Sequence, residues 1–187
     1  MAYPQGTTRI WLRPADGPKD DPTLSPPKSV LLDTLGYVDG KCNDTMAAYV
    51  GEDGKGVQVT FWMHHPPLVS YFTVHSPGVK PDTFPEMAKV LATDGDLALL
   101  RIPRLPVDPV RIYPFSDQPA NRYFIYRIGG GAGGEKQPWL RQLPNPHKLI
   151  FTNRTVGLLN YGTHGQADDR FFAAAFYQEH PLRPGAP

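Results

Sequence analysis

Short runs of apolar and β-branched residues, separated by turn-forming residues, recur along most of this chain, and this pattern is typical of an all-β protein. The run Val57–Met63 begins with strict alternation, which puts Val57, Val59, Phe61 and Met63 on one face of a strand. We expect further strands at Val30–Val38, Leu68–His75, Tyr123–Ile128, Pro138–Pro144, Val156–Tyr161 and Arg170–Tyr177. About eight strands at fairly regular spacing predict a sandwich, a barrel or a propeller.

The clearest local signal is a β-hairpin centred on the dipeptide Asp94-Gly95. The apolar runs Lys89–Thr93 and Asp96–Ile102 flank this dipeptide. A two-residue Asp-Gly loop favours a type I′ turn, because the positive φ angles of that turn match the twist of the flanking strands. We therefore predict a tight two-residue turn at Asp94 and Gly95.

Two segments are ambiguous between helix and strand. The run Phe171–Tyr177 contains three consecutive alanines, and alanine is the best helix former. Its shortness and its aromatic residues favour a buried strand instead. The segment Asn43–Tyr49 is the other candidate for a short helix.

The proline and glycine content sets the domain layout. The chain has 22 prolines and 18 glycines among 187 residues, and proline breaks helix interiors, so short elements joined by many turns are expected. Residues 1–28 end in a polar, proline-rich stretch without periodicity, which predicts a disordered N-terminal segment. We expect the β domain to span residues 29–178 and residues 179–187 to form a loose tail.

The charge and the cysteine content limit the kinds of partner and the cellular compartment that we expect. Nineteen basic and 18 acidic residues give a net charge of +1, and no basic run forms the footprint of a nucleic-acid site. The single cysteine, Cys42, excludes an intrachain disulfide and favours a reducing compartment. The N-terminus does not resemble a secretory signal, and no apolar stretch is long enough to cross a membrane. We therefore expect the protein to be located in the cytoplasm or the nucleus and to have neither a membrane nor a nucleic acid as its partner.

Five stretches of this chain occur in an order that resembles a known family: Ser29–Asp33, Val57–Phe61, Pro66–Gly78, Ala92–Arg101 and Tyr123–Arg127. They are similar to the N-terminal half of a large plant family, expanded in grasses, that is defined by "domain of unknown function 1618". The likeness covers roughly Ser29 to Tyr177, and members of that family are usually much longer. No catalytic residues are established for the family, so the resemblance implies none here.

A second, weaker resemblance concerns the later part of the chain. The stretches Tyr123–Arg127, Trp139–Pro144, Val156–Leu159 and Arg170–Tyr177 are similar in order to plant F-box-associated propellers. This resemblance implies blades of short antiparallel strands. The expected fold class is therefore all-β with short antiparallel strands, either propeller-like, including an incomplete propeller, or a sandwich.

Glycine and histidine motifs suggest chemistry that their context does not support. Residues 129–134 satisfy G-x-G-x-x-G, but no helix of useful length follows, so a loop is favoured over a dinucleotide site. His64, His65 and His75, with Asp94, suggest a metal site. Adjacent histidines on a strand point to opposite faces, and no metal-ligand spacing is present. We therefore expect no metal and no cofactor.

Nucleophile and glycosylation motifs are equally weak. No G-x-S-x-G phrase surrounds Ser70, Ser76 or Ser116, and no protease-like phrase surrounds Cys42. The acceptor patterns at Asn43–Thr45 and Asn153–Thr155 are interpreted as chance matches, because no secretory signal is found. We assign no catalytic residues and do not expect an enzyme.

The aromatic residues are interpreted as core and sheet faces rather than as a platform for stacking bases, because basic residues are not interleaved with them. They are Tyr71, Phe72, Tyr123, Phe124, Tyr126, Phe171, Phe172, Phe176 and Tyr177.

Three functional hypotheses follow from the sequence. The favoured one is a non-enzymatic protein-interaction module with an unidentified protein partner, because loops between strands commonly bind partners. The second is a metal-binding or small-ligand-binding enzyme that uses His64 and His75 with Asp94. The third is a truncated chain without independent function.

Overall fold

The computed structural model describes residues 27–52, 54, 56–80, 84, 86–103, 121–129, 137–144, 153–161 and 170–176. Most of the predicted N-terminal segment 1–28, the tail 179–187 and residues 104–120 lie outside these residues. The described strands are β1 (Leu31–Val38), β2 (Ala47–Val50), β3 (Gly56–Trp62), β4 (Val69–His75), β5 (Ala88–Asp94), β6 (Leu97–Pro103), β7 (Asn121–Arg127), β8 (Trp139–Gln142), β9 (Val156–Asn160) and β10 (Phe171–Ala175).

These elements confirm the all-β prediction. A 3-10 helix, η3 (Asn153–Thr155), is the sole helical element among the described residues. The described part of the chain also contains no helix that is long and apolar enough to cross a membrane.

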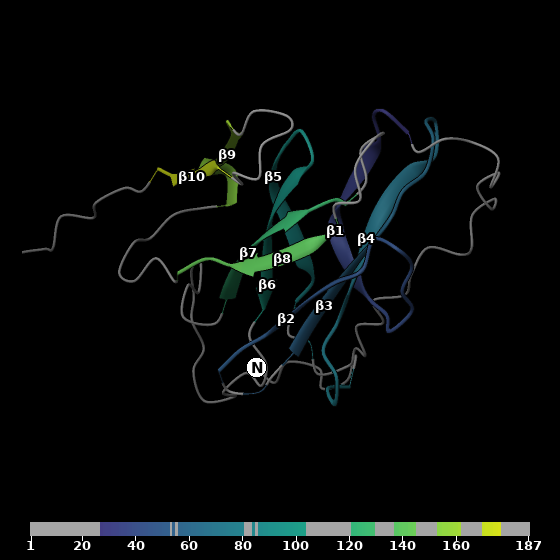
Figure 1. Ribbon diagram of the computed structural model, residues 1–187. Helices are drawn as coiled ribbons and strands as arrows, with labels where there is room; N and C mark the ends of the chain where they lie inside the picture. Colours follow the sequence, from purple (N-terminus) through teal and green to yellow (C-terminus); the bar gives the residue numbers. More distant parts are fainter. Residues whose placement is uncertain are drawn as a thin grey trace, which may run out of the picture.

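Eight strands form one mixed sheet in the order β2-β3-β4-β1-β5-β6-β7-β8. All neighbouring strands in it are antiparallel except β1 and β4, which are parallel. The sheet curls until its edge strands β2 and β8 approach each other, so that it forms a nearly closed barrel (Figure 1). A sheet curled around one core is compatible with both alternatives left by the sequence, a sandwich and an incomplete propeller.

Contacts between the β2 edge of the sheet and β7, the neighbour of β8, hold the barrel closed. The Tyr126 hydroxyl on β7 donates a hydrogen bond of 2.6 Å to the carbonyl of Thr45, two residues before β2. The ring of Tyr49 on β2 meets the ring of Phe124 edge to face, with 5.5 Å between the ring centroids. Both contacts join residues that are far apart in the sequence, so closure depends on the whole sheet.

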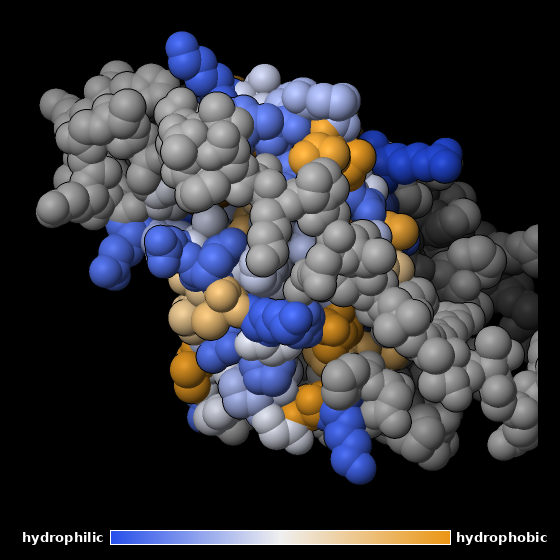
Figure 2. All heavy atoms as spheres, turned by 90° about the vertical axis from the view of Figure 1, so that its right-hand side faces the viewer, coloured by the Kyte–Doolittle hydropathy of each residue, from blue (hydrophilic) through white to orange (hydrophobic). Residues whose placement is uncertain are grey.

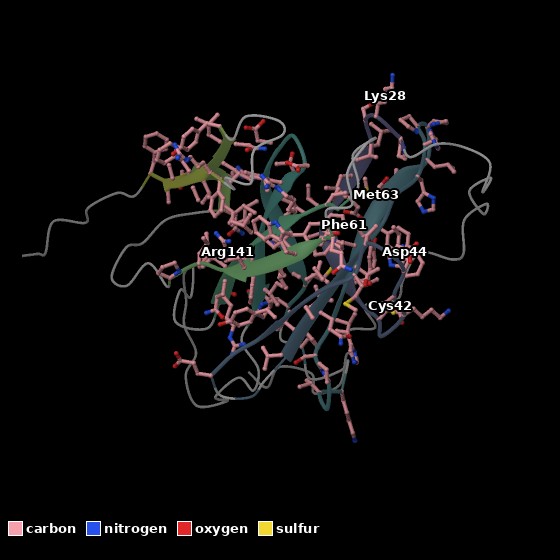
Figure 3. The ribbon with its side chains drawn as sticks, in the orientation of Figure 1. Lys28, Cys42, Asp44, Phe61, Met63 and Arg141 are labelled. Atoms are coloured by element: carbon pink, nitrogen blue, oxygen red, sulfur yellow. The ribbon has the colours of Figure 1, made fainter. Side chains whose placement is uncertain are left out.

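The core lies on the inner face of this curled sheet. Val57, Val59 and Phe61 are buried there and Met63 packs against them, as the alternation predicted. Figure 3 shows Phe61 between β4 and β8, in the interior. Its ring centroid lies 4.4 Å from that of Tyr126, so the two sides of the barrel meet at this point.

The hairpin of β9 and β10 packs on the outside of the barrel, next to β5 (Figure 1). Leu97, Leu99 and Ile125 point outward from β6 and β7 and are buried, because Leu158 and Phe171 of the hairpin pack near them. The strand β6 is therefore buried on both faces, which accounts for its continuous apolar run.

The β5–β6 hairpin exists as predicted, but its turn lies one residue later. Asp94 pairs with Leu97, so the two turn residues are Gly95 and Asp96. Gly95 has a φ of 59°, which glycine adopts at little cost. The Asp94 carboxylate accepts a hydrogen bond of 2.7 Å from the backbone nitrogen of Asn160 on β9, and this contact fixes Asp94 at the strand end.

The helix considered at Asn43–Tyr49 is wrong, because side chains there bind the backbone. The Asn43 side-chain oxygen accepts a hydrogen bond of 2.9 Å from the Thr45 nitrogen. The Asn43 side-chain nitrogen donates one of 3.0 Å to the Phe61 carbonyl. The chain therefore turns and enters β2 at Ala47.

The same hydrogen bonds give the side-chain amide of Asn43 a structural role. Asn43 is part of an apparent glycosylation motif.

Candidate interaction surface

The structure does not bring His64, His75 and Asp94 together. In the β3–β4 pair, Trp62 lies opposite Tyr71 and Gln58 lies opposite His75, so His64 and His75 lie at opposite ends of these strands. The metal site considered from the sequence is therefore not formed.

The histidines have other surroundings. The His64 ring stacks on Tyr71 at 5.9 Å, and the His75 ring lies 3.5 Å from where a Cβ at Gly40 would be. Within the described ranges, no three His, Cys, Asp or Glu side chains form a group that could hold a metal ion.

Two candidate nucleophiles, Ser70 and Ser76, form hydrogen bonds with the backbone, and a third, Cys42, is a free cysteine. The buried Ser70 accepts a hydrogen bond of 2.9 Å through Oγ from the backbone nitrogen of His64. The Ser76 Oγ donates one of 2.8 Å to the carbonyl of Gly56. Cys42 is a free, exposed cysteine, and Figure 3 shows it near Asp44, away from the core.

Two of the remaining motifs lie largely outside the described residues. Ser116 and residues 130–134 of the glycine-rich stretch belong to undescribed parts of the chain. Asn153–Thr155, the second apparent glycosylation motif, forms η3.

The aromatic residues divide into two groups. Tyr71, Phe72, Tyr123, Phe124 and Tyr126 are buried, which confirms that they belong to the core. The second group is on the C-terminal hairpin, where β10 confirms the expected strand but the expectation that this strand is buried is wrong. Phe172 is 60% exposed and Phe176 is 80% exposed. Tyr177 lies outside the described residues.

The hairpin of β9 and β10 has apolar side chains on both faces. Alternate residues, among them Val156, Leu158 and Phe171, pack against the barrel. The residues between them point the other way and form what we call the hairpin outer face: Gly157, Leu159, Tyr161, Phe172, Ala174 and Phe176. Leu159 is 55% exposed and Tyr161 is 46% exposed.

This surface is held in a fixed position on the barrel. Asn160 of β9 donates from its backbone to Asp94 and from its side chain to Asp96, at 2.7 and 3.1 Å. The rings of Tyr161 and Phe172 stack with their centroids 4.7 Å apart. A rigid aromatic pair on an anchored hairpin loses little conformational freedom when it binds a partner.

The opposite side of the molecule, over β1 and β4, looks different. Exposed Leu31 lies beside exposed Val69, its partner in the ladder. Figure 2, which faces this side, shows small apolar groups separated by hydrophilic residues. The exposed apolar residues recorded on this side are aliphatic, whereas the hairpin outer face exposes a stacked aromatic pair.

Three tyrosines with raised pKa values predict a loss of stability at high pH. Burial is the largest cause that raises the pKa of Tyr37, to about 12, with the hydrogen bond to Asp33 as a further cause. Burial also raises the pKa values of Tyr123 and Tyr126. These phenols stay protonated in the folded state at pH values where the unfolded chain ionises. Their contribution is therefore complete below the unfolded pKa of about 10 and is lost as the pH rises above it.

Urea unfolding between pH ~9 and ~11.5 should show this decline, and tyrosinate absorbance should appear late. The variant Tyr37→Phe should show a shallower decline, because it has one raised phenol fewer. A free energy of unfolding that stays constant over this interval would contradict the prediction.

Comparisons with protein-family models, with curated proteins and with solved structures found no match. The structure itself defines the protein as a nearly closed, mixed β-barrel with a hairpin docked on its outer wall.

Proposed function

We propose that this protein is a non-enzymatic protein-interaction module that binds a protein partner through the hairpin outer face. The observation that carries the proposal is the exposure of Leu159, Tyr161, Phe172 and Phe176 on the same face of one anchored hairpin. A large apolar side chain covers ~150–250 Å², so these exposed fractions correspond to roughly 500 Å². Apolar patches of about 300–600 Å² are often functional.

The chemistry of this surface favours a protein as the partner. Aromatic residues are enriched in protein–protein interfaces, and charged residues are depleted at their centres. The centre of the hairpin outer face, formed by Leu159, Phe172, Gly157 and Ala174, carries no charge. The sets of residues considered for catalysis are not assembled in the described structure, which supports a binding role. We place the protein in the cytoplasm or the nucleus, in keeping with its single cysteine.

Site-specific photo-crosslinking tests this proposal. A photoreactive phenylalanine analogue at position 176 should give crosslinked protein in a plant-cell extract. The same analogue at Val50, which is 69% exposed on β2, serves as a control and should give little. The change Phe172→Glu should abolish the crosslink and weaken binding of the purified partner at least about tenfold. Equal crosslinking from both positions would count against the proposal, as would no effect of Phe172→Glu.

A further inference from the structure

We infer that the hairpin outer face binds a second copy of this chain, as a symmetric dimer. This inference rests on the proposed function, because it names the partner of the same surface. It comes from the order of large and small side chains along the two strands. Phe172 lies opposite Leu159 in the ladder, and the next pair on the same face is Ala174 opposite Gly157.

These two pairs form a ridge and a hollow. Phe172 and Leu159 project into solvent, whereas Ala174 and Gly157 leave the surface low. A Cβ placed on Gly157 would meet no heavy atom within 4 Å, so the space above this glycine is open. Phe176 borders the hollow at its other end, since its backbone nitrogen extends the ladder by a 2.9 Å hydrogen bond to the Thr155 carbonyl.

A two-fold axis in the plane of the interface, perpendicular to the strands, reverses the order of these pairs on the second copy. Each ridge then lies over the hollow of the other copy, with Phe172 over the partner's Ala174 and Leu159 over the partner's Gly157. An isologous interface requires such self-complementarity, because both copies contribute the same surface. The hairpin outer face therefore matches a second copy of itself without any rearrangement.

The ends of the surface match in the same arrangement. Arg170 lies one step beyond Phe172 on the same face, next to Tyr161, whose nitrogen donates to the Arg170 carbonyl at 3.2 Å. Reversal brings Arg170 over the partner's Phe176, and a contact between an arginine and an aromatic ring is favourable. The net charge of +1 means that two copies repel each other very little over longer distances.

The area sets the expected strength of the dimer. Two faces of roughly 500 Å² bury about 1,000 Å² in total, which is near the lower limit for a specific interface. We therefore expect a weak dimer that dissociates on dilution, with a dissociation constant on the order of micromolar.

A swap of two residues tests the arrangement directly. Phe172→Ala places a small side chain over the partner's small Ala174, and Ala174→Phe places a large side chain over the partner's large Phe172. Both single variants should therefore be monomeric. The double variant F172A/A174F restores large over small in reversed order and should dimerise again. Because both positions are exposed, all variants should fold and melt like the original chain.

Sedimentation velocity between ~1 and ~300 µM measures the outcome, over a range that brackets a micromolar dissociation constant. The original chain and the double variant should approach twice the 20.8 kDa monomer mass, while both single variants stay monomeric. Stronger association of Ala174→Phe would indicate unspecific adhesion of apolar surface and overturn the inference.

A second outcome separates this inference from the proposed function. The original chain could be monomeric at all concentrations tested and still crosslink to a different protein from position 176. In that case the inference of a symmetric dimer is wrong, and the proposal of a protein-interaction module is supported. If the original chain does not self-associate and the analogue at position 176 gives no crosslink, both proposals fail.

Discussion

Gly36→Ala is expected to destabilise the protein by about 3 kcal/mol, because the barrel has no room for a side chain there. Gly36 on β1 lies beside Phe72 in the parallel ladder with β4. A Cβ at this position would overlap Cε2 and Cζ of Phe72 and come within 3.1 Å of the Ala88 Cβ. Phe72 is fully buried and stacks on Phe61 at 5.4 Å, so its ring cannot move aside without displacing the core.

Urea unfolding of Gly36→Ala, with the three companion variants Gly56→Ala, Phe72→Leu and G36A/F72L, tests this cause. Gly56→Ala is the matched control, since its nearest neighbour, Pro77 Cδ, would lie at an ordinary 3.6 Å. Gly56→Ala should change the free energy of unfolding by at most about 0.5 kcal/mol. In the double variant G36A/F72L the overlapping ring atoms are gone, so the two changes should couple favourably by about 1 kcal/mol. Additive losses in that double variant would show that the ring is not the obstacle.

The sequence predicted the strands well and their arrangement poorly. Alternation over Val57–Met63 located both β3 and the face of it that is buried, because period two is a local property of the chain. The parallel pairing of β1 with β4 is not a local property. It depends on the fit of Gly36 under Phe72 and on the order of strands in the whole sheet, and no short-range pattern encodes that order.

Polar contacts between residues distant in the sequence explain the smaller errors. Asn43 and Thr45 prevent a helix by hydrogen bonding to the backbone around Phe61, a residue 16 or more positions away. The turn of the β5–β6 hairpin moved by one residue because Asp94 is held by Asn160, 66 positions later. In both cases the partner that decides the conformation is distant in the sequence.

The exposed face of the C-terminal hairpin is the feature that the sequence predicts wrongly. The run Phe171–Phe176 is short, apolar and rich in aromatic residues, which favours a buried strand. A strand with apolar residues on both faces is buried only if another layer covers each face. The described structure covers one face of the hairpin with the barrel and leaves Phe172 and Phe176 exposed on the other. The sequence could not show this, because it does not tell how many layers a strand lies between.

Closure of the barrel should depend on Tyr126. Its ring is fully buried against Phe61, and its hydroxyl donates to the Thr45 carbonyl at 2.6 Å, which joins β7 to the residues before β2. Tyr126→Ala should cost about 3–5 kcal/mol, because it leaves a cavity in the core and removes the hydrogen bond. Tyr126→Phe keeps the ring and should cost about 1–2 kcal/mol, because the carbonyl loses its donor.

Hydrogen exchange distinguishes closure from general weakening. Thr45 also binds β3, since its Oγ1 donates to the Phe61 carbonyl at 2.7 Å. Loss of the Tyr126 hydroxyl should therefore loosen β2 first, and the amides of Ala47–Val50 should exchange faster in Tyr126→Phe while those of β6 change less. Tyr161→Phe removes a hydroxyl from an exposed ring and should leave both sets unchanged. Equal acceleration in β2 and β6 would mean that the hydroxyl stabilises the barrel as a whole rather than its closing edge.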